Sequence, residues 1–434
     1  MKLQKFLLRY FPPGLGLEYS QRGERKKKMI NLLHLTTSTD IMNLGKSIMD
    51  NEPLVTESVK PQLLSVLAKL QKKLFDDINN QYIQHRTLDY HDMPITQVAV
   101  NKDGSKCITG SFDQTCKVCD TETGDVLLNL SHTGIIYGVS FNNPYGDRIM
   151  TASFDRTACI WDAETGKRLL TLFGHKDEVV VAKYDPIDNL VGTASMDQTA
   201  KIFDFETGEE LWSIEEHRDT IISLQFSNDG NTVLTGSFDS NIFLWDKRTH
   251  KKEVAFEDHK AEISNCCLNF ESTLVGSGSV DSTARVWDVR TQKCLLTLMH
   301  DDEVVSVDFD KTGRKFATAC TDGLAKVFDL SLDNGKPTSI LTGHTKELSK
   351  ITFTPGGGFV ITSSSDGTVR LWHWDTGVCA QILTHHKDEV YDFAISYDGS
   401  ALVTASKDCT SQIFKRSPSY CDQYETMFKD SDSL

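Results

Sequence analysis

The sequence has no run of about 18 apolar residues, so it predicts no membrane-spanning helix. It also lacks a small-residue cleavage site after the opening Met1–Pro13, although Lys2, Lys5 and Arg9 alternate there with apolar residues as in a transit peptide. The hydrophobic content of 39% is typical of a soluble globular protein. We therefore expect neither a membrane span nor a targeting segment.

The residue sets that build common catalytic, metal and cofactor sites are missing as well. Cys116 and Cys119 form a CxxC motif, but no second CxxC follows at zinc-ribbon spacing, and alternation along a strand puts the two thiols on opposite faces. Gly356-Gly357-Gly358 matches the other glycine turns and has no Walker lysine. The eleven cysteines are odd in number and scattered, which favours reduced thiols in the cytoplasm. The sequence thus predicts no enzyme, no metal site and no cofactor.

Charge is divided unevenly along the chain, which carries a formal net charge of −15. Residues 1–80 hold 13 Lys and Arg against 8 Asp and Glu, a net charge of +5, whereas the remainder holds 33 against 53, a net charge of −20. An acidic domain is a poor binder of nucleic acid. We expect it to attract a basic protein partner or the basic N-terminal region.

What the sequence does contain is a motif that recurs eight times, 41 to 44 residues apart. An aspartate follows a histidine by 22 or 23 residues, and a hydroxyl residue precedes that aspartate by four. Six residues after the aspartate comes an aromatic residue, or Cys119 in the first copy. Four copies are complete: His132, Thr151, Asp155, Trp161; His217, Thr235, Asp239, Trp245; His259, Ser277, Asp281, Trp287; and His344, Thr362, Asp366, Trp372. The copies that begin at His91, His175, His300 and His386 carry Cys119, Phe203, Phe328 and Phe414 in place of tryptophan.

Self-similarity at this period, with Trp-Asp endings, is typical of WD40 blades. In such blades the indole, hydroxyl, imidazole and carboxylate form a chain of hydrogen bonds, so we expect eight structural tetrads. A Ser/Thr, His and Asp set also fits a hydrolase triad. Eight copies at fixed spacing argue against that interpretation, because an active site needs one exposed nucleophile. The four blades without tryptophan are expected to be held less tightly.

Each repeat predicts four short strands separated by turns, as at 221–226, 231–236, 242–245 and 253–256 in the fourth repeat. The prediction is an all-β, eight-bladed WD40 β-propeller over residues 81–415. A small helical N-terminal domain, residues 1–80, precedes it, and a polar tail, residues 416–434, follows. Residues 82–90 read as an outer strand without preceding partners, so we expect them to complete the last blade and close the ring.

Two amphipathic helices are predicted in the N-terminal domain. Residues 37–50 place apolar side chains at helical spacing behind Ser38 or Thr39 as the cap, and residues 58–75 carry a leucine-rich stripe. We expect the stripe to pack within this domain or against the propeller. The basic run from Arg22 to Lys28 is expected to be solvated.

Two sets of side chains are predicted to gather on the propeller face that carries the tetrad histidines and aspartates. Glutamates three residues after the histidines form an acidic arc: Glu178, Glu262, Glu303, Glu347 and Glu389. Apolar residues directly before the aspartates form an apolar arc on blades one to five: Phe112, Phe154, Met196, Phe238 and Val280. Clustered apolar residues on an exposed rim indicate a partner interface. The alternatives are common repeat filler at these positions, or an N-terminal domain that covers the apolar arc.

The opening "MKLQKFLLRYFPPGLGLEY", the segments "STDI" and "LLSVLAKLQKKL", and "FNNPYGDRIMTASFDRT" and "TGSFD" in the repeats resemble the family of ciliary dynein assembly factors with WD repeats, or outer row dynein assembly proteins. Cys119, the residues before His91 and His132, and the tail depart from its pattern. The resemblance implies a non-catalytic cargo adaptor that links preassembled outer-arm axonemal dynein to an intraflagellar transport B-complex subunit, for delivery into motile cilia. It also implies that a cleft between the N-terminal domain and the propeller binds the transport subunit, and a location in the cytoplasm and the cilium or flagellum, near the basal body.

Two other roles stay open. Trp245-Asp246-Lys247-Arg248 and Trp287-Asp288-Val289-Arg290 match the Trp-Asp-x-Arg pattern of WD40 substrate receptors of cullin-type ubiquitin ligases, although the arginines also suit solvated turns. A centriolar or cytoskeletal scaffold built on the same repeats is the other role, and the N-terminal sequence argues against it.

Overall fold

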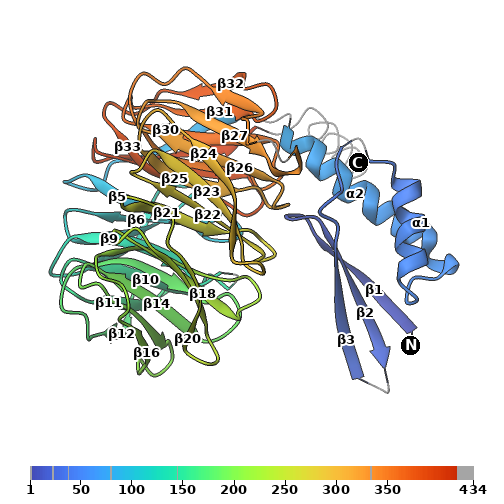
Figure 1. Cartoon of the computed structure of the whole chain (residues 1–434), viewed down its shortest axis with the longest axis horizontal. Coiled ribbons are helices and arrows are strands. Elements are labelled where there is room, and N and C mark those ends of the chain that lie inside the picture. Colours follow the sequence, from blue (N-terminus) through green and yellow to red (C-terminus); the bar gives the residue numbers. More distant parts are fainter. Residues whose placement is uncertain are drawn as a thin grey trace, which may run out of the picture.

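The computed structural model describes residues 2–21, 24–37, 39–78, 81–143, 145–332 and 335–417. The repeats form one body of radially arranged sheets, and the N-terminal helices and a three-stranded sheet lie beside it (Figure 1). No helix in this described part of the chain is both long and apolar enough to cross a membrane. Residues 418–434, the bulk of the predicted polar tail, lie outside the described residues.

Each repeat folds into a four-stranded antiparallel sheet, here called a blade and numbered along the chain. Blades one to four consist of β5 (Ile95–Val100), β6 (Lys106–Ser111), β7 (Thr115–Asp120), β8 (Val126–Ser131), β9 (Ile136–Phe141), β10 (Arg148–Ser153), β11 (Ala158–Asp162), β12 (Arg168–Leu172), β13 (Val179–Tyr184), β14 (Leu190–Ser195), β15 (Ala200–Asp204), β16 (Glu210–Ile214), β17 (Ile221–Phe226), β18 (Thr232–Ser237), β19 (Ile242–Asp246) and β20 (Lys251–Phe256).

Blades five to eight consist of β21 (Ile263–Leu268), β22 (Leu274–Ser279), β23 (Thr283–Asp288), β24 (Lys293–Met299), β25 (Val304–Phe309), β26 (Lys315–Cys320), β27 (Ala325–Asp329), β28 (Ser339–Leu341), β29 (Leu348–Phe353), β30 (Phe359–Ser364), β31 (Val369–His373), β32 (Cys379–Leu383), β33 (Val390–Ile395), β34 (Ala401–Ser406), β35 (Ser411–Arg416) and β4 (Tyr82–Leu88). A short 3-10 helix, η2 (Leu330–Leu332), follows β27.

The blades close into a ring. The innermost strands of neighbouring blades contact one another all the way round, and β33 of the eighth blade contacts β5 of the first. The last blade is completed by β4, which precedes the first blade in sequence and pairs antiparallel with β35. Counted over the described residues, eight sheets have this four-stranded form. The predicted all-β propeller class is confirmed.

The apolar core lies between adjacent blades, because alternate side chains of each strand face opposite neighbours. Blade one shows the division at its CxxC motif. Cys116 packs in a cluster shared with blade two, whereas Cys119 packs in a cluster shared with blade eight. The two thiols therefore lie on opposite faces of their sheet.

The N-terminal domain combines the two predicted helices with a sheet that the sequence analysis missed. Its elements are β1 (Lys2–Arg9), β2 (Gly14–Gln21), β3 (Glu24–Asn31), α1 (Ile41–Asn51), the 3-10 helix η1 (Glu57–Val59) and α2 (Lys60–Ile78). Leu15 and Leu17 of β2 share one buried cluster with Leu63 and Leu67 of α2. The alternation of these leucines with glycines was the available signal for a strand. The stripe of α2 therefore packs within this domain.

The predicted cap of α1 is wrong for Thr39, and Ser38 lies outside the described residues. Asp40 is the cap: its carboxylate accepts hydrogen bonds from the backbone nitrogens of Met42 at 2.8 Å and Asn43 at 3.4 Å. Thr39 instead uses its hydroxyl to accept from the backbone of Thr36, and so stabilises the preceding turn. The helix consequently begins at Ile41, four residues later than predicted.

Candidate partner-binding surfaces

The members of each tryptophan-containing tetrad lie in one hydrogen-bonded chain. In blade two, the indole of Trp161 donates to Thr151 Oγ1 over 2.8 Å, Thr151 Oγ1 lies 2.7 Å from His132 Nε2, and His132 Nδ1 lies 2.9 Å from Asp155. The structure brings together the other three sets at 2.8 to 3.0 Å: His217, Thr235, Asp239 and Trp245; His259, Ser277, Asp281 and Trp287; His344, Thr362, Asp366 and Trp372.

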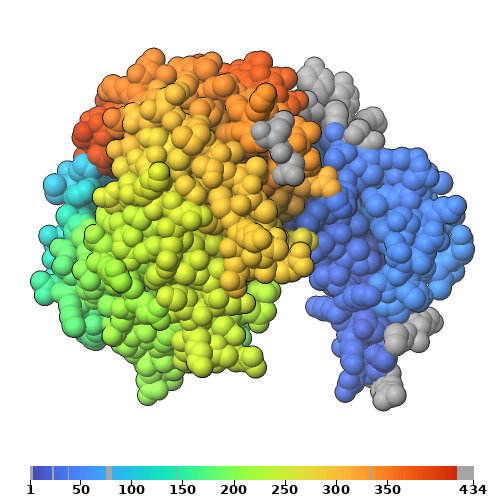
Figure 2. All heavy atoms as spheres, in the orientation of Figure 1, coloured from blue at the N-terminus to red at the C-terminus, as the bar shows by residue number. Residues whose placement is uncertain are grey.

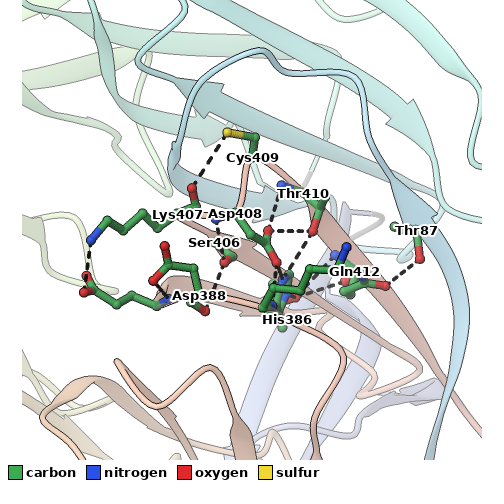
Figure 3. Close-up of polar contacts among 12 residues, drawn as sticks. Thr87, His386, Asp388, Ser406, Lys407, Asp408, Cys409, Thr410 and Gln412 are labelled. Atoms are coloured by element: carbon green, nitrogen blue, oxygen red, sulfur yellow. Dashed lines mark hydrogen bonds and ion pairs between the residues drawn. The ribbon is translucent and has the colours of Figure 1, made fainter.

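The turn that contains the tetrad aspartate fixes its carboxylate, as blade eight shows (Figure 3). Asp408 accepts from Thr410 Oγ1 at 2.7 Å and from the backbone nitrogen of Lys387 at 2.9 Å, and His386 Nδ1 lies 3.0 Å away. The backbone nitrogen of Asp408 donates to Ser406 Oγ at 3.1 Å. Burial alone would raise the pKa of the Asp408 carboxyl, but the hydrogen bonds from His386 and Thr410 outweigh it and lower that pKa.

These networks resemble a hydrolase triad only in composition. The Thr151 side chain is buried, and its oxygen is already shared by an indole and an imidazole. A substrate carbonyl has no path to such a hydroxyl, and attack on it needs an exposed nucleophile. The tetrads therefore contribute to stability, and partner-binding side chains are expected on the surface above them.

That surface, the tetrad face, carries the predicted acidic arc. Glu262, Glu303 and Glu347 are exposed, whereas Glu178 and Glu389 are half-buried. Glu389 also forms an ion pair with Lys407 at 3.1 Å. The free negative charge of the arc is therefore concentrated on blades five to seven.

The apolar arc lies on the same face over blades one to five, and its fifth member, Val280, is half-buried. Met196 is 37% exposed and Phe238 41% exposed, while Phe112 and Phe154 are half-buried. Tyr137 was not predicted as part of this arc, but its ring stacks on that of Phe154 with centroids 5.6 Å apart. A partly exposed aromatic pair flanked by large apolar side chains is typical of a protein-binding surface.

The N-terminal domain packs on the opposite face of the propeller. Successive turns of a meander alternate between the two ends of a sheet, so the turn after β33, which holds Tyr397, lies opposite the turn that holds Asp408. Tyr397 contacts Phe11 of the N-terminal domain, and the guanidinium of Arg9 lies 5.0 Å from the ring centre of Phe270. The alternative in which this domain covers the apolar arc is therefore wrong.

A groove remains between the N-terminal domain and the propeller, and Figure 2 shows the two parts as separate lobes that diverge away from their contact. The N-terminal residues along it include Pro13, Leu33, Leu35 and Leu74, and the propeller residues include Lys311, Arg314, Lys315, Trp374 and the turn of Gly356, Gly357 and Gly358.

Basic and aromatic groups are organised on the propeller side of this groove. The ammonium of Lys315 lies 3.6 Å from the ring centre of Trp374 and donates to the carbonyl oxygen of Gly357 at 3.2 Å. Arg314 reaches across to within 3.5 Å of His34 Nε2. The groove thus presents mainly apolar side chains on one wall. The other wall mixes the cations of Lys311, Arg314 and Lys315 with the carboxylates of Asp310, Asp329 and Asp375.

Known proteins share this architecture and parts of this sequence. A family model described as IFT122 first beta-propeller matches residues 193–431, and the model of the WD domain, G-beta repeat, matches residues 83–120, 124–162 and 166–204. The crystal structure of the computationally designed Ika8 protein superimposes with a TM-score of 0.68 and 26% identity, covering 76% of this chain and 99% of that one.

Curated relatives point in a narrower direction. Dynein assembly factor with WD repeat domains 1 from Macaca fascicularis is 47% identical over 147 residues, and its Homo sapiens counterpart is 46% identical over the same length. Each alignment covers 34% of this chain and 35% of the relative, so the matched region spans about a third of the length of these proteins. With more than half of its length matched by one family model, the chain belongs to the WD-repeat propeller family described as the IFT122 first beta-propeller, and it is related to the dynein assembly factors with WD repeats.

Proposed function

We propose that this chain is a non-catalytic adaptor in dynein assembly. It links preassembled outer-arm axonemal dynein to a B-complex subunit of intraflagellar transport, for delivery into motile cilia. It acts in the cytoplasm and in the cilium or flagellum, near the basal body. The name of the curated relatives, dynein assembly factor, supports the coarser part of this proposal.

The observation that carries the adaptor role is the presence of two unlike surfaces on opposite faces of a rigid ring. The tetrad face combines exposed carboxylates with an aromatic and apolar arc. The groove on the other face combines apolar side chains with charges of both signs, the cations of Lys311 and Arg314 beside the carboxylates of Asp310, Asp329 and Asp375. Because the surfaces are separate and differ in charge, they suit two different partners bound at the same time. We assign the transport subunit to the groove and dynein to the tetrad face.

The test is affinity capture from ciliated cells with three full-length variants. The groove variant carries Lys311→Glu and Arg314→Glu, and the face variant carries Glu262→Lys, Glu303→Lys and Glu347→Lys. A matched control carries Glu164→Lys, Glu209→Lys and Glu253→Lys, three exposed positions outside both surfaces. Melting temperatures establish that each variant is folded.

We expect the groove variant to lose transport subunits and keep dynein, the face variant to do the reverse, and the control to keep both. Loss of both partners from either surface variant would contradict the two-surface adaptor. Capture of cullin-ligase subunits without dynein would replace the proposal with the ubiquitin-ligase receptor. In that case Arg248 and Arg290, both exposed, become the residues to mutate next.

A further inference from the structure

In blade six the tetrad is incomplete, because its histidine is not hydrogen-bonded to its aspartate. In the other seven blades, the histidine Nδ1 lies 2.7 to 3.0 Å from the tetrad aspartate. In blade six, His300 Nε2 lies 3.2 Å from Thr318 Oγ1, but its Nδ1 is buried without a hydrogen-bond partner. His300 is only 7% exposed, so water does not readily replace the missing group. An unsatisfied buried polar atom costs about 1–3 kcal/mol, which makes this arrangement unusual.

Two substitutions in the turn after β26 explain why the aspartate of this blade is not held. In the other seven blades, a serine two residues before the aspartate accepts from the aspartate nitrogen at 3.0 to 3.1 Å. In six of those blades, a threonine two residues after it donates to the carboxylate at 2.6 to 2.7 Å. Blade six has Cys320 and Leu324 at these positions. Asp322 retains a bond from the Leu324 nitrogen at 2.8 Å and is exposed.

The loss of tryptophan in this blade allows His300 to carry its proton on Nε2. Phe328 has no N–H to donate to Thr318, so Thr318 Oγ1 is free to accept from His300 Nε2–H while its own hydroxyl donates to the carbonyl of Lys326 at 3.4 Å. The Nδ1 of His300 then carries a lone pair. A tetrad histidine that faces a carboxylate must instead carry its proton on Nδ1. The unpaired Nδ1 of His300 is therefore suited to a hydrogen-bond donor.

The surroundings of that nitrogen are acidic. Asp301, Asp302, Glu303 and the released Asp322 are all exposed on the tetrad face. Lys326 is the cation that acts on His300, and its ammonium is bound to the carbonyl oxygen of Met299 at 3.1 Å. Met299 itself is 68% exposed, so an apolar side chain borders the carboxylates.

We propose that the incomplete tetrad of blade six is a docking site for a basic segment of a partner protein. A lysine or arginine of that segment donates to Asp322 and the neighbouring carboxylates, and reaches His300 Nδ1 when the turn at 320–324 moves aside. An adjacent apolar residue of the partner packs on Met299. The proposal rests on the proposed function, because it specifies the chemistry of the partner bound to the tetrad face. Its test does not require dynein.

The test uses a variant with Cys320→Ser and Leu324→Thr, which restores both anchors and leaves the net charge unchanged. The probe is a fluorescent amphipathic peptide with arginine on one helical face and leucine on the other, and its binding to the full-length chain is measured by anisotropy. We expect the anchored variant to bind roughly tenfold more weakly, because Asp322 returns to His300. A second variant with Asp301→Asn, Asp302→Asn and Asp322→Asn should weaken binding to a similar degree.

The matched charge control carries Glu164→Gln, Glu209→Gln and Glu253→Gln and should keep its affinity within about twofold. Nitrogen-15 NMR of the histidine rings adds an independent readout: His300 should carry its proton on Nε2 in the parent and on Nδ1 in the anchored variant. Equal peptide affinity of parent and anchored variant, or equal weakening by the charge control, would overturn the docking site. If the parent chain binds the peptide as expected but captures no dynein from ciliated cells, the result counts against the proposed function alone.

Discussion

The phenolic oxygen of Tyr397 lies 2.5 Å from the carbonyl oxygen of Phe11 and 3.3 Å from its backbone nitrogen, although the residues are 386 positions apart. Their rings meet edge to face, with centroids 6.2 Å apart. This contact joins the tip of the N-terminal sheet to the eighth blade. It therefore helps to hold the N-terminal domain against the propeller, together with the contacts of Arg9 with Phe270 and of Arg314 with His34.

Replacing Tyr397 by Phe should loosen that contact without unfolding the propeller. The ring stays, but the hydroxyl and both hydrogen bonds are lost, a cost of about 1–2 kcal/mol. Amide exchange at Phe11 and in β2 should become faster, while the melting temperature of the propeller stays the same. Tyr145→Phe is the control, because Tyr145 is 83% exposed. Unchanged exchange at Phe11 would mean that other contacts hold the N-terminal domain.

Trp287 allows the packing and hydrogen-bonding contributions of a tetrad to be separated. Trp287→Phe removes the indole donor to Ser277 Oγ, which lies 3.0 Å away, and should cost about 1 kcal/mol of unfolding free energy. Trp287→Ala also leaves a cavity and should cost about 3–5 kcal/mol. Urea denaturation gives both values. Equal losses in the two variants would show that the ring does not stabilise the blade by packing.

Gln412 stabilises the closure of the ring. Its side-chain oxygen accepts from Gln84 Nε2 and Thr87 Oγ1, each at 2.8 Å, and the Thr87 contact is drawn in Figure 3. Gln412→Ala should lower the unfolding free energy by about 1–3 kcal/mol and speed amide exchange along β4. Ile83→Ala, at a position on the same strand that is 60% exposed, is the control. Exchange that rises equally in all blades would contradict a local role.

His300 should make the protein sensitive to acid. Burial, assisted by the charge of Lys326, lowers the pKa of His300 to about 4. Because this folded-state pKa lies below the value of about 6.5 in an unfolded chain, the unfolded chain binds the proton more readily. The unfolding free energy that depends on neutral His300 is therefore fully present above pH 6.5, and it is lost as the pH falls toward 4.

His300→Gln keeps a side-chain group facing Thr318 and removes the titration. Between pH 6.5 and 4 this variant should lose about 2 kcal/mol less unfolding free energy than the parent. Urea denaturation at several pH values measures the difference. The exposed His385→Gln is the control and should follow the parent. Parallel pH curves for parent and His300→Gln would show that His300 does not carry the effect.

The propeller was predictable because its repeats place a histidine, a hydroxyl residue and an aspartate at fixed spacing. Once one tetrad is identified, the same spacing locates the other tetrads and therefore the other blades. The departure of blade six can also be found in the sequence, since Cys320 and Leu324 occupy positions where the other seven repeats have serine and six of them have threonine. The N-terminal sheet was less so. Lysines dominate β3, and a solvated run and an edge strand with an exposed face have the same composition.

The position of the N-terminal domain could not be read from the sequence at all. It depends on Phe11 meeting Tyr397 and on Arg9 meeting Phe270, contacts between residues hundreds of positions apart. Nothing in the local pattern of either partner specifies the other. The same limit applied to Tyr137 and Phe154, whose stacking arises only once two strand ends of blade two are brought together.

The pairing of β4 with β35 also constrains how the protein is made. Gln84 leaves the ribosome 328 residues before Gln412, its partner across the seam. During most of translation β4 has no strand to pair with, because β35 is synthesised last, whereas the other seven blades can already form. An emerging chain therefore exposes an unpaired strand until synthesis is nearly complete, and a nascent-chain chaperone that shields strand edges would bind there.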